Sequence, residues 1–117
     1  MKFKVTPQSI PEVLLIEPIV FADDRGYFKE SYNLKDFEEF LPGVTFVQDN
    51  ESKSTRGVLR GLHFQRPPYA QAKLVRVIQG SIWDVAVDIR PDSPTFEQYC
   101  FAELTAENHL QFFVPRG

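Results

Sequence analysis

Proline and glycine divide this chain into short apolar stretches and leave little room for long helices. The 117 residues include nine prolines and six glycines, spread along the chain. The stretches between them are rich in β-branched and aromatic residues, which favour β-strands. Strands are therefore expected at residues 13–16, 45–48, 58–65, 74–78, 82–89, 96–104 and 111–114. Many short strands separated by turn signals are typical of a β-sandwich or barrel.

One short helix is expected among these strands, after a turn signal at residues 23–26. Asn33 is a good N-cap, and Asp36 three residues later is close to a capping box. A proline–glycine pair at 42–43 would end the helix. Its apolar face would consist of Leu34, Phe37 and Leu41, with Phe40 beside them. The length and the 43% hydrophobic content indicate one domain, residues 1–117, with a core of its own.

A β-hairpin is expected where residues 74–78 and 82–89 flank the turn signal at 79–81. Alternation along the second strand separates an apolar face from a polar face, namely Trp83, Val85, Val87, Ile89 and Asp84, Ala86, Asp88, Arg90. A face with two carboxylates usually lies against solvent. The alternative is that the polar face lines a pocket inside a barrel wide enough for a ligand.

Composition argues against several classes of partner and location. The net charge of −3 does not favour general attraction to nucleic acid or membrane. No stretch approaches the roughly 20 apolar residues of a membrane span, and the start lacks an apolar segment of signal-peptide length. The single cysteine, Cys100, excludes an intramolecular disulfide and fits a reducing compartment. A cytoplasmic protein is therefore expected.

Residues 52–83 form a basic stretch in an acidic protein. They contain no aspartate or glutamate, although the chain as a whole carries more acidic than basic residues. One interpretation is a basic surface patch. The other is a site for a compact anion such as phosphate or pyrophosphate, whose oxygens the arginine fork binds in pairs. The basic residues are Lys53, Arg56, Arg60, Arg66, Lys73 and Arg76.

His63 lies inside this basic stretch and is a candidate general base. A histidine in a strand is often structural, but His63 has Arg60, Gly61 and Lys73 close by in sequence. Surrounding positive charge favours the neutral imidazole, which is the form that accepts a proton. In an ideal strand Arg60 and His63 would point to opposite faces, so a bend or bulge at Gly61 would be needed to bring them into one pocket.

The sequence gives little support for a metal site or for a catalytic nucleophile. A zinc or iron site needs three or four His, Cys or carboxylate ligands, and the two histidines, His63 and His109, are far apart in sequence. The chain also has no Gly-x-Ser-x-Gly elbow and no glycine-rich phosphate loop. No catalytic metal and no cofactor are expected.

Seven sequence blocks form a specific pattern when taken in order. One of them is GVLRGLHFQ at residues 57–65, and the others lie at 21–30, 46–54, 71–76, 84–90, 93–96 and 111–117. In their order and spacing they resemble the dTDP-4-dehydrorhamnose 3,5-epimerase family. The resemblance covers nearly the whole chain.

The resemblance implies a cupin-type jelly roll, a homodimer in which N-terminal strands cross to the partner, and an epimerase that uses no metal. The substrate would be dTDP-4-dehydro-6-deoxy-D-glucose, a nucleotide sugar. The product would be dTDP-4-dehydro-L-rhamnose, formed by removing protons at C3 and C5 beside the C4 ketone. This step precedes the final reduction in dTDP-L-rhamnose synthesis.

The resemblance also implies a role for particular residues. His63 matches the family's general base, and Lys73 matches the residue that stabilises the enolate oxygen. Arg60 matches an arginine that binds the substrate near its diphosphate. Asp84 lies in a matching block and receives no role. The positions that match the nucleotide-binding residues are Arg25, Phe28, Glu30, Gln48 and Asn50.

The chain departs from the family pattern at its end. The family's proton-donating tyrosine, and the carboxylate that pairs with the histidine base, would lie beyond Gly117. We therefore expect a jelly roll that is incomplete at the C-terminus, and little or no epimerase activity from the 117-residue chain alone. Two alternatives stay open: a single-site epimerase or ketoisomerase acting on a related nucleotide sugar, and a non-catalytic cupin that binds nucleotide sugars.

Overall fold

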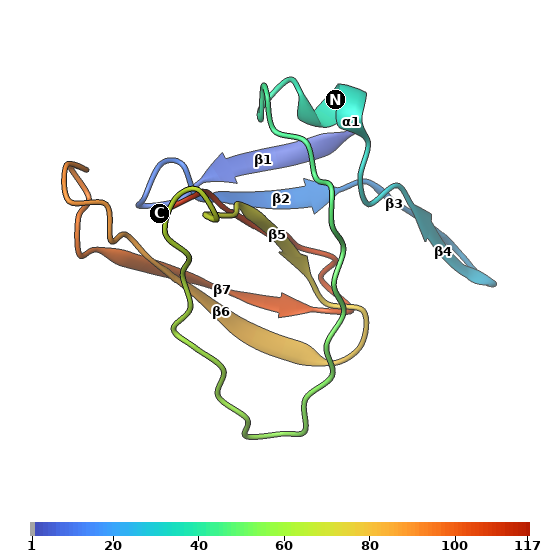
Figure 1. Cartoon of the computed structure of the whole chain (residues 1–117). Helices are drawn as coiled ribbons and strands as arrows, with labels where there is room; N and C mark the ends of the chain where they lie inside the picture. The colour runs from blue at the N-terminus through green and yellow to red at the C-terminus, as the bar shows by residue number, and fades with distance from the viewer. Residues whose placement is uncertain (1) are drawn as a thin grey trace.

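The computed structural model describes residues 2–117, which form a mainly β structure as the sequence predicts (Figure 1). Within these residues there are eight strands and one short helix. None of the described helical segments is long and apolar enough to cross a membrane. The elements are β1 (Phe3–Pro7), β2 (Leu14–Pro18), β3 (Val20–Asp23), β4 (Gly26–Lys29), α1 (Leu34–Phe37), β5 (Lys73–Arg76), β6 (Ser81–Val87), β7 (Tyr99–Thr105) and β8 (Gln111–Val114).

The strands form one larger sheet and two hairpins. The larger sheet has the order β1-β2-β8-β5, and all its neighbouring strands are antiparallel. Strands β6 and β7 pair with each other and form a second layer. Strands β3 and β4 form a separate hairpin that projects away from both layers (Figure 1). The fold therefore consists of two packed β layers with an arm attached to one side.

Strand β8 lies inside the larger sheet and is buried on both faces. Neighbouring side chains of a strand point to opposite faces, so Phe112 and Phe113 serve two separate cores. Phe112 packs in a cluster beside β6 and β7, together with Ile10, Val13, Ala86, Cys100, Ala102 and Leu104. Phe113 packs in a cluster beside α1, together with Phe3, Leu14, Ile16, Phe37 and Leu41. The larger sheet is thus covered by the β6–β7 hairpin on one face and by α1 on the other.

The predicted helix is confirmed, although it is only one turn long. The Asn33 side chain accepts a hydrogen bond from the backbone N–H of Asp36 at 3.2 Å, as expected of an N-cap. Phe37 and Leu41 are buried against the sheet. Leu34 is exposed, so its predicted place on the apolar face is wrong. A single turn has room to bury only part of such a face.

The strands predicted at residues 45–48 and 58–65 are wrong. Residues 41–72 contain no strand or helix, and the segment passes in front of the two layers as an irregular chain (Figure 1). Leu59 is 93% exposed and Val47 is 90% exposed. A strand needs a neighbour for its backbone hydrogen bonds, and none of the strands in residues 2–117 pairs with this segment.

The hairpin predicted between residues 74–78 and 82–89 is also wrong. Strand β5 pairs with β8, whereas β6 pairs with β7 in the other layer. The chain crosses from one layer to the other around Gly80, whose φ of 85° is readily adopted only by glycine. A turn signal of this kind is the same for a hairpin and for a change of layer, so local sequence does not separate the two.

The polar face of β6 points inward, contrary to the solvent-facing interpretation. Ala86 and Asp88 on this face are buried, whereas Trp83 on the apolar face is 64% exposed. The inner face packs against the Phe112 cluster, to which Ala86 itself belongs. The carboxylate of Asp88 tolerates burial because neighbouring side chains supply its hydrogen bonds.

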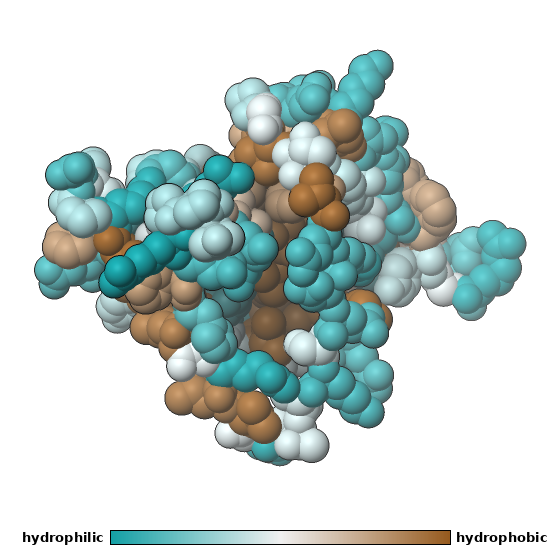
Figure 2. Space-filling view, viewed as in Figure 1, coloured by the Kyte–Doolittle hydropathy of each residue, from teal (hydrophilic) through white to brown (hydrophobic). Residues whose placement is uncertain are grey.

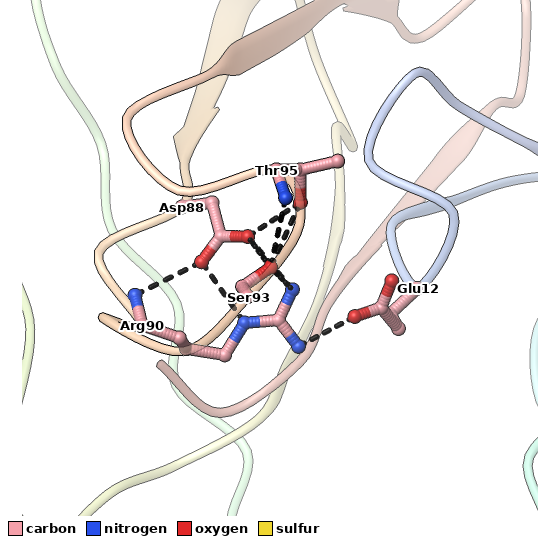
Figure 3. Close-up of polar contacts among 5 residues, drawn as sticks. All are labelled: Glu12, Asp88, Arg90, Ser93 and Thr95. Atoms are coloured by element: carbon pink, nitrogen blue, oxygen red, sulfur yellow. Dashed lines mark hydrogen bonds and ion pairs between the residues drawn. The ribbon is translucent and has the colours of Figure 1, made fainter.

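Asp88 is the centre of a polar network that closes one end of the two layers (Figure 3). Its side chain is 1% exposed and accepts two hydrogen bonds from the Arg90 guanidinium, each 2.9 Å long. The hydroxyls of Ser93 and Thr95 also donate to it. Arg90 in turn pairs with Glu12 of the β1–β2 connection. The network therefore ties the loop after β6 to the edge of the larger sheet. It also holds the pKa of Asp88 well below its usual range, chiefly through the hydrogen bonds from Arg90 and then through those from Ser93 and Thr95.

Asp88→Asn is expected to destabilise the fold by about 3 kcal/mol, because it leaves Arg90 without its buried partner. Urea unfolding near neutral pH measures the loss. The lowered pKa of Asp88 stabilises the folded chain above the unfolded carboxyl pKa of about 3.9, and this contribution is lost as the pH falls below it. Asp88→Asn should lack this pH-dependent part of the free energy of unfolding. Asp92→Asn, on an exposed residue of the same loop, is the matched control and should change stability by less than about 0.5 kcal/mol. Equal stability of the two variants would contradict a structural role for the network.

Candidate functional site

The predicted site residues lie on three separate parts of the structure. The first part is the β3–β4 hairpin with the residue that follows it. The second is the irregular segment within residues 45–72. The third is the start of β5. These parts carry, in that order, Arg25, Phe28 and Glu30; Gln48, Asn50, Arg60 and His63; and Lys73.

The hairpin presents Arg25 and Phe28 to solvent. Arg25 lies in the turn between β3 and β4, where its Nη2 is 2.7 Å from Oδ2 of Asp23. This contact orients the guanidinium, but the Arg25 side chain remains 90% exposed. Phe28, on β4, is 70% exposed. An exposed guanidinium can bind an anion, and an exposed ring on the same arm can stack on a planar ring.

Glu30 is fixed where the hairpin joins α1. Its carboxylate accepts hydrogen bonds from the Asn33 amide and from Nζ of Lys2, the latter at 3.1 Å. The Asn33 bond is the main cause of a lowered pKa for Glu30, and Lys2 adds to it. Glu30 is therefore an oriented, charged acceptor at the base of the arm.

The irregular segment is organised by Arg60 and bends at Gly61. The Nε of Arg60 donates to the hydroxyl of Ser54 at 2.8 Å, which closes the loop between these residues. Gly61 has a φ of 134°, outside the range that other residues adopt easily, so the backbone is not a regular strand here. The backbone thus bends at Gly61, and the placement of Arg60 and His63 in one pocket stays a prediction. His63 follows this bend and is exposed.

Gln48 and Asn50 lie earlier in the same segment. The Nε2 of Gln48 donates to Oδ1 of Asn50 at 3.2 Å. Both residues are exposed, so their remaining polar atoms are free to bind a ligand. The bond shows that the two side chains act as a local pair and point to the same side of the chain.

Asp84, to which the sequence analysis assigned no role, lies near enough to Lys73 to be affected by its charge. One carboxylate oxygen of Asp84, Oδ2, is buried and lacks a hydrogen-bond partner within residues 2–117. Burial raises the pKa of Asp84, while a bond from the Val85 N–H and the charge of Lys73 act in the opposite direction. Asp84 is also the first acidic residue after the basic stretch 52–83, which is the sequence signal that marks it.

The described residues do not gather these three parts into one pocket. The β3–β4 hairpin points away from the layers, whereas the segment with His63 runs across them (Figure 1). Between that segment and the sheets the surface is hollowed and apolar (Figure 2). A separate hollow of about 290 Å³ contains none of the predicted site residues and is lined by Gln65, Pro67, Pro68, Ala70, Arg116 and Gly117. Within residues 2–117 no three His, Cys, Asp or Glu side chains lie close enough to hold a metal ion.

Comparisons with known proteins all lead to one family. The family described as dTDP-4-dehydrorhamnose 3,5-epimerase matches residues 7–117. The dTDP-4-dehydrorhamnose 3,5-epimerase of Shigella flexneri is 57% identical over 114 residues, which are 97% of this chain and 63% of the relative. The chain therefore spans less than two thirds of that relative's length.

Solved structures share the fold. The dTDP-6-deoxy-D-glucose-3,5-epimerase of Legionella pneumophila, in complex with dTDP-4-keto-L-rhamnose, is 49% identical with a TM-score of 0.92, over 98% of this chain and 61% of the other. A 3'-monoepimerase from Streptomyces bikiniensis in complex with dTDP-quinovose is 32% identical with a TM-score of 0.88. The match covers 95% of this chain and 57% of the monoepimerase chain. The cupin-like β fold predicted from the sequence is confirmed.

Asp84→Asn is expected to raise the urea midpoint at about pH 7.5, because it removes a charge that burial penalises. The raised pKa of Asp84 means that this penalty is complete above the folded pKa and disappears as the pH falls below the unfolded value of about 3.9. The difference in urea midpoint between Asp84→Asn and the parent should therefore become smaller as the pH is lowered. Asp49→Asn, on an exposed residue, should show no such difference. A lower midpoint for Asp84→Asn would mean that its charge is needed by Lys73.

Proposed function

Since the chain belongs to the dTDP-4-dehydrorhamnose 3,5-epimerase family, we propose that the protein converts dTDP-4-dehydro-6-deoxy-D-glucose to dTDP-4-dehydro-L-rhamnose in dTDP-L-rhamnose synthesis. The observation that carries this proposal is the family match over residues 7–117, at 57% identity to the Shigella flexneri relative. The Legionella pneumophila relative, bound to dTDP-4-keto-L-rhamnose, supports the same substrate class.

His63 is the general base in this proposal. Its neutral imidazole removes the proton from C3, and in a second event from C5, because both carbons adjoin the C4 ketone. The electron pair of each C–H bond moves to form an enolate with its charge on the C4 oxygen. A positioned base contributes roughly 10²–10⁴-fold to such a step. The exposure of His63 and the bend at Gly61 are consistent with access to a substrate.

Lys73 stabilises the enolate oxygen. A charge aimed at a developing oxyanion is usually a large contribution to the rate. Lys73 begins β5, whose pairing with β8 fixes its backbone, and its positive charge acts on half-buried Asp84. The carbon is then reprotonated from the opposite face of the ring. The family resemblance assigns that proton to a tyrosine beyond residue 117.

The remaining residues bind the nucleotide. Arg60 binds near the diphosphate, and the exposed Arg25 and Phe28 suit a charged and a planar part of the nucleotide. We further propose a homodimer, because the β3–β4 hairpin projects away from the two layers and its exposed residues are available to a second copy (Figure 1). We expect the protein in the cytoplasm, with no nucleic acid or membrane partner and no cofactor. The other nucleotide-binding residues are Glu30, Gln48 and Asn50.

A single-site epimerase is the second candidate. The similarity to the 3'-monoepimerase of Streptomyces bikiniensis, at 32% identity, supports it. The higher identity to the 3,5-epimerases favours exchange at both carbons. The two candidates share the base and the enolate, and they differ only in how many carbons lose a proton.

The decisive experiment measures deuterium uptake from D₂O into the 4-keto sugar by NMR. The proteins are the 117-residue chain and a fusion of this chain to the remaining C-terminal part of the Shigella flexneri relative. We expect uptake at both C3 and C5 with the fusion, and little or none with the 117-residue chain. Uptake at one carbon alone would identify a monoepimerase, and no uptake by a folded fusion that still binds dTDP would indicate a non-catalytic cupin.

His63→Asn in the fusion is expected to lower kcat about 10²–10⁴-fold, because no other group is assigned to remove the proton. Asparagine keeps a similar size and leaves the binding residues in place, so KM should change little. Lys53→Met, within the same basic stretch but without an assigned role, is the matched control and should leave kcat near that of the parent fusion. An unchanged kcat for His63→Asn would remove His63 from the mechanism.

A further inference from the structure

One hydrogen bond between residues far apart in sequence joins the base of the β3–β4 hairpin to the body. Nζ of Lys29, on β4, lies 2.8 Å from Nδ1 of His109, in the connection between β7 and β8. A lysine ammonium has hydrogens to donate and no lone pair to accept with. Nδ1 must therefore be the acceptor, which requires His109 to be neutral with its proton on Nε2.

The surroundings of this contact favour a neutral His109. The Tyr27 ring lies edge-on to His109, with 4.7 Å between the ring centroids, and Nζ of Lys29 lies 5.7 Å from the Tyr27 centroid. Burial, and then the charge of Lys29, lower the pKa of His109, against a smaller opposing effect of Glu107. Burial and the charge of Arg76 lower the pKa of Lys29. The charged groups facing the contact from β5 and from the β7–β8 turn are thus Arg76 and Glu107.

A second attachment nearby does not titrate. The Gln111 side chain is fully buried, and its Nε2 donates to the backbone oxygen of Ser31 at 2.8 Å. This amide bond holds the chain just after β4 whatever the pH. The hairpin itself packs little against the body, as the exposure of Phe21, Tyr27 and Phe28 shows. Its direction therefore depends on its two contacts with His109, the hydrogen bond from Lys29 and the edge-on Tyr27 ring.

We propose that Lys29 and His109 form a proton-sensitive latch that positions the β3–β4 hairpin. When His109 is neutral, it accepts the Lys29 hydrogen bond and the hairpin is held. When His109 gains a proton, Nδ1 loses its lone pair and two cations face each other, with Arg76 as a third positive charge nearby. The hairpin is then attached through its continuation into β2, where the Ile19 N–H donates to the Lys2 backbone oxygen, and through the segment that Gln111 holds.

The consequence for binding rests on the proposed function. The hairpin carries Arg25 and Phe28, which we assign to the nucleotide, and it carries no group assigned to proton transfer. In an active protein, opening of the latch would raise KM for the nucleotide sugar and leave kcat unchanged. The latch itself is a property of the free chain and is testable without substrate.

The backbone of His109 indicates a suitable non-titrating replacement. Its φ is 57°, a left-handed conformation in which asparagine is among the better-tolerated residues. The Oδ1 of asparagine can accept a hydrogen bond near the place of Nδ1 and does not titrate in this range. His109→Asn should therefore keep the latch closed at every pH. Lys29→Met removes the donor, and Lys35→Met, on an exposed residue of α1, is its matched control.

The test is hydrogen–deuterium exchange of the 117-residue chain at about pH 7.5 and about pH 4.5, the second chosen well below the ordinary histidine pKa because the pKa of His109 is lowered. The exchange rates of the backbone amides of residues 20–29 are corrected for the intrinsic rate at each pH. The resulting protection is expressed relative to that of the β8 amides. We expect protection of the hairpin in the parent to fall about tenfold at the lower pH, which corresponds to loss of one charge-assisted hydrogen bond. His109→Asn should stay protected at both pH values, Lys29→Met should be unprotected at both, and Lys35→Met should behave as the parent.

Two results would overturn the latch. One is equal relative protection of the parent hairpin at both pH values. The other is a loss of hairpin protection at the lower pH that is as large in His109→Asn as in the parent, because the pH response would then belong to another group. Neither result depends on a nucleotide sugar, so failure of the latch and failure of the proposed epimerase function are separable.

Discussion

The burial of β8 on both faces is the constraint on which the rest of this structure depends. A strand with Phe112 on one side and Phe113 on the other leaves a large apolar surface in water unless two different elements cover it. The β6–β7 hairpin covers one side and α1 covers the other. Because the two rings are adjacent in sequence, the layers on either side of the sheet are locked in register with each other. The same strand supplies Gln111, which fixes the base of the projecting hairpin.

This arrangement gives the predicted site residues unequal support. Lys73 lies on β5, which pairs directly with β8, and Asp84 lies on β6 at the opposite side of the same core. These two residues are set by the packed layers. The hairpin with Arg25 and Phe28 is held by polar contacts at its base, and His63 lies on a segment that is not paired in a sheet. The parts assigned to nucleotide binding and to the base are therefore positioned by single polar contacts, and the part assigned to the enolate by the packed layers.

Local features were predictable because their physical causes are local. The Asn33 cap depends on residues three apart, and the turn at residues 23–26 between β3 and β4 depends on consecutive residues. Strand pairing and the direction of each face depend on residues far away. The β6 alternation was read correctly as two faces, but the sequence did not reveal that the buried face would be the one with Asp88. Its burial is possible only because Arg90, Ser93 and Thr95 surround the carboxylate in three dimensions.

The sequence by itself determined the mainly β class, the short capped helix and, through its ordered blocks, the family. Those properties follow from side-chain chemistry and spacing along the chain. Only the tertiary structure decided that β5 and β6 belong to different layers, that residues 58–65 form no strand, and that Lys29 meets His109 across 80 residues. Each of these depends on which partner a segment finds, because backbone hydrogen bonds and burial are satisfied between elements and not within them.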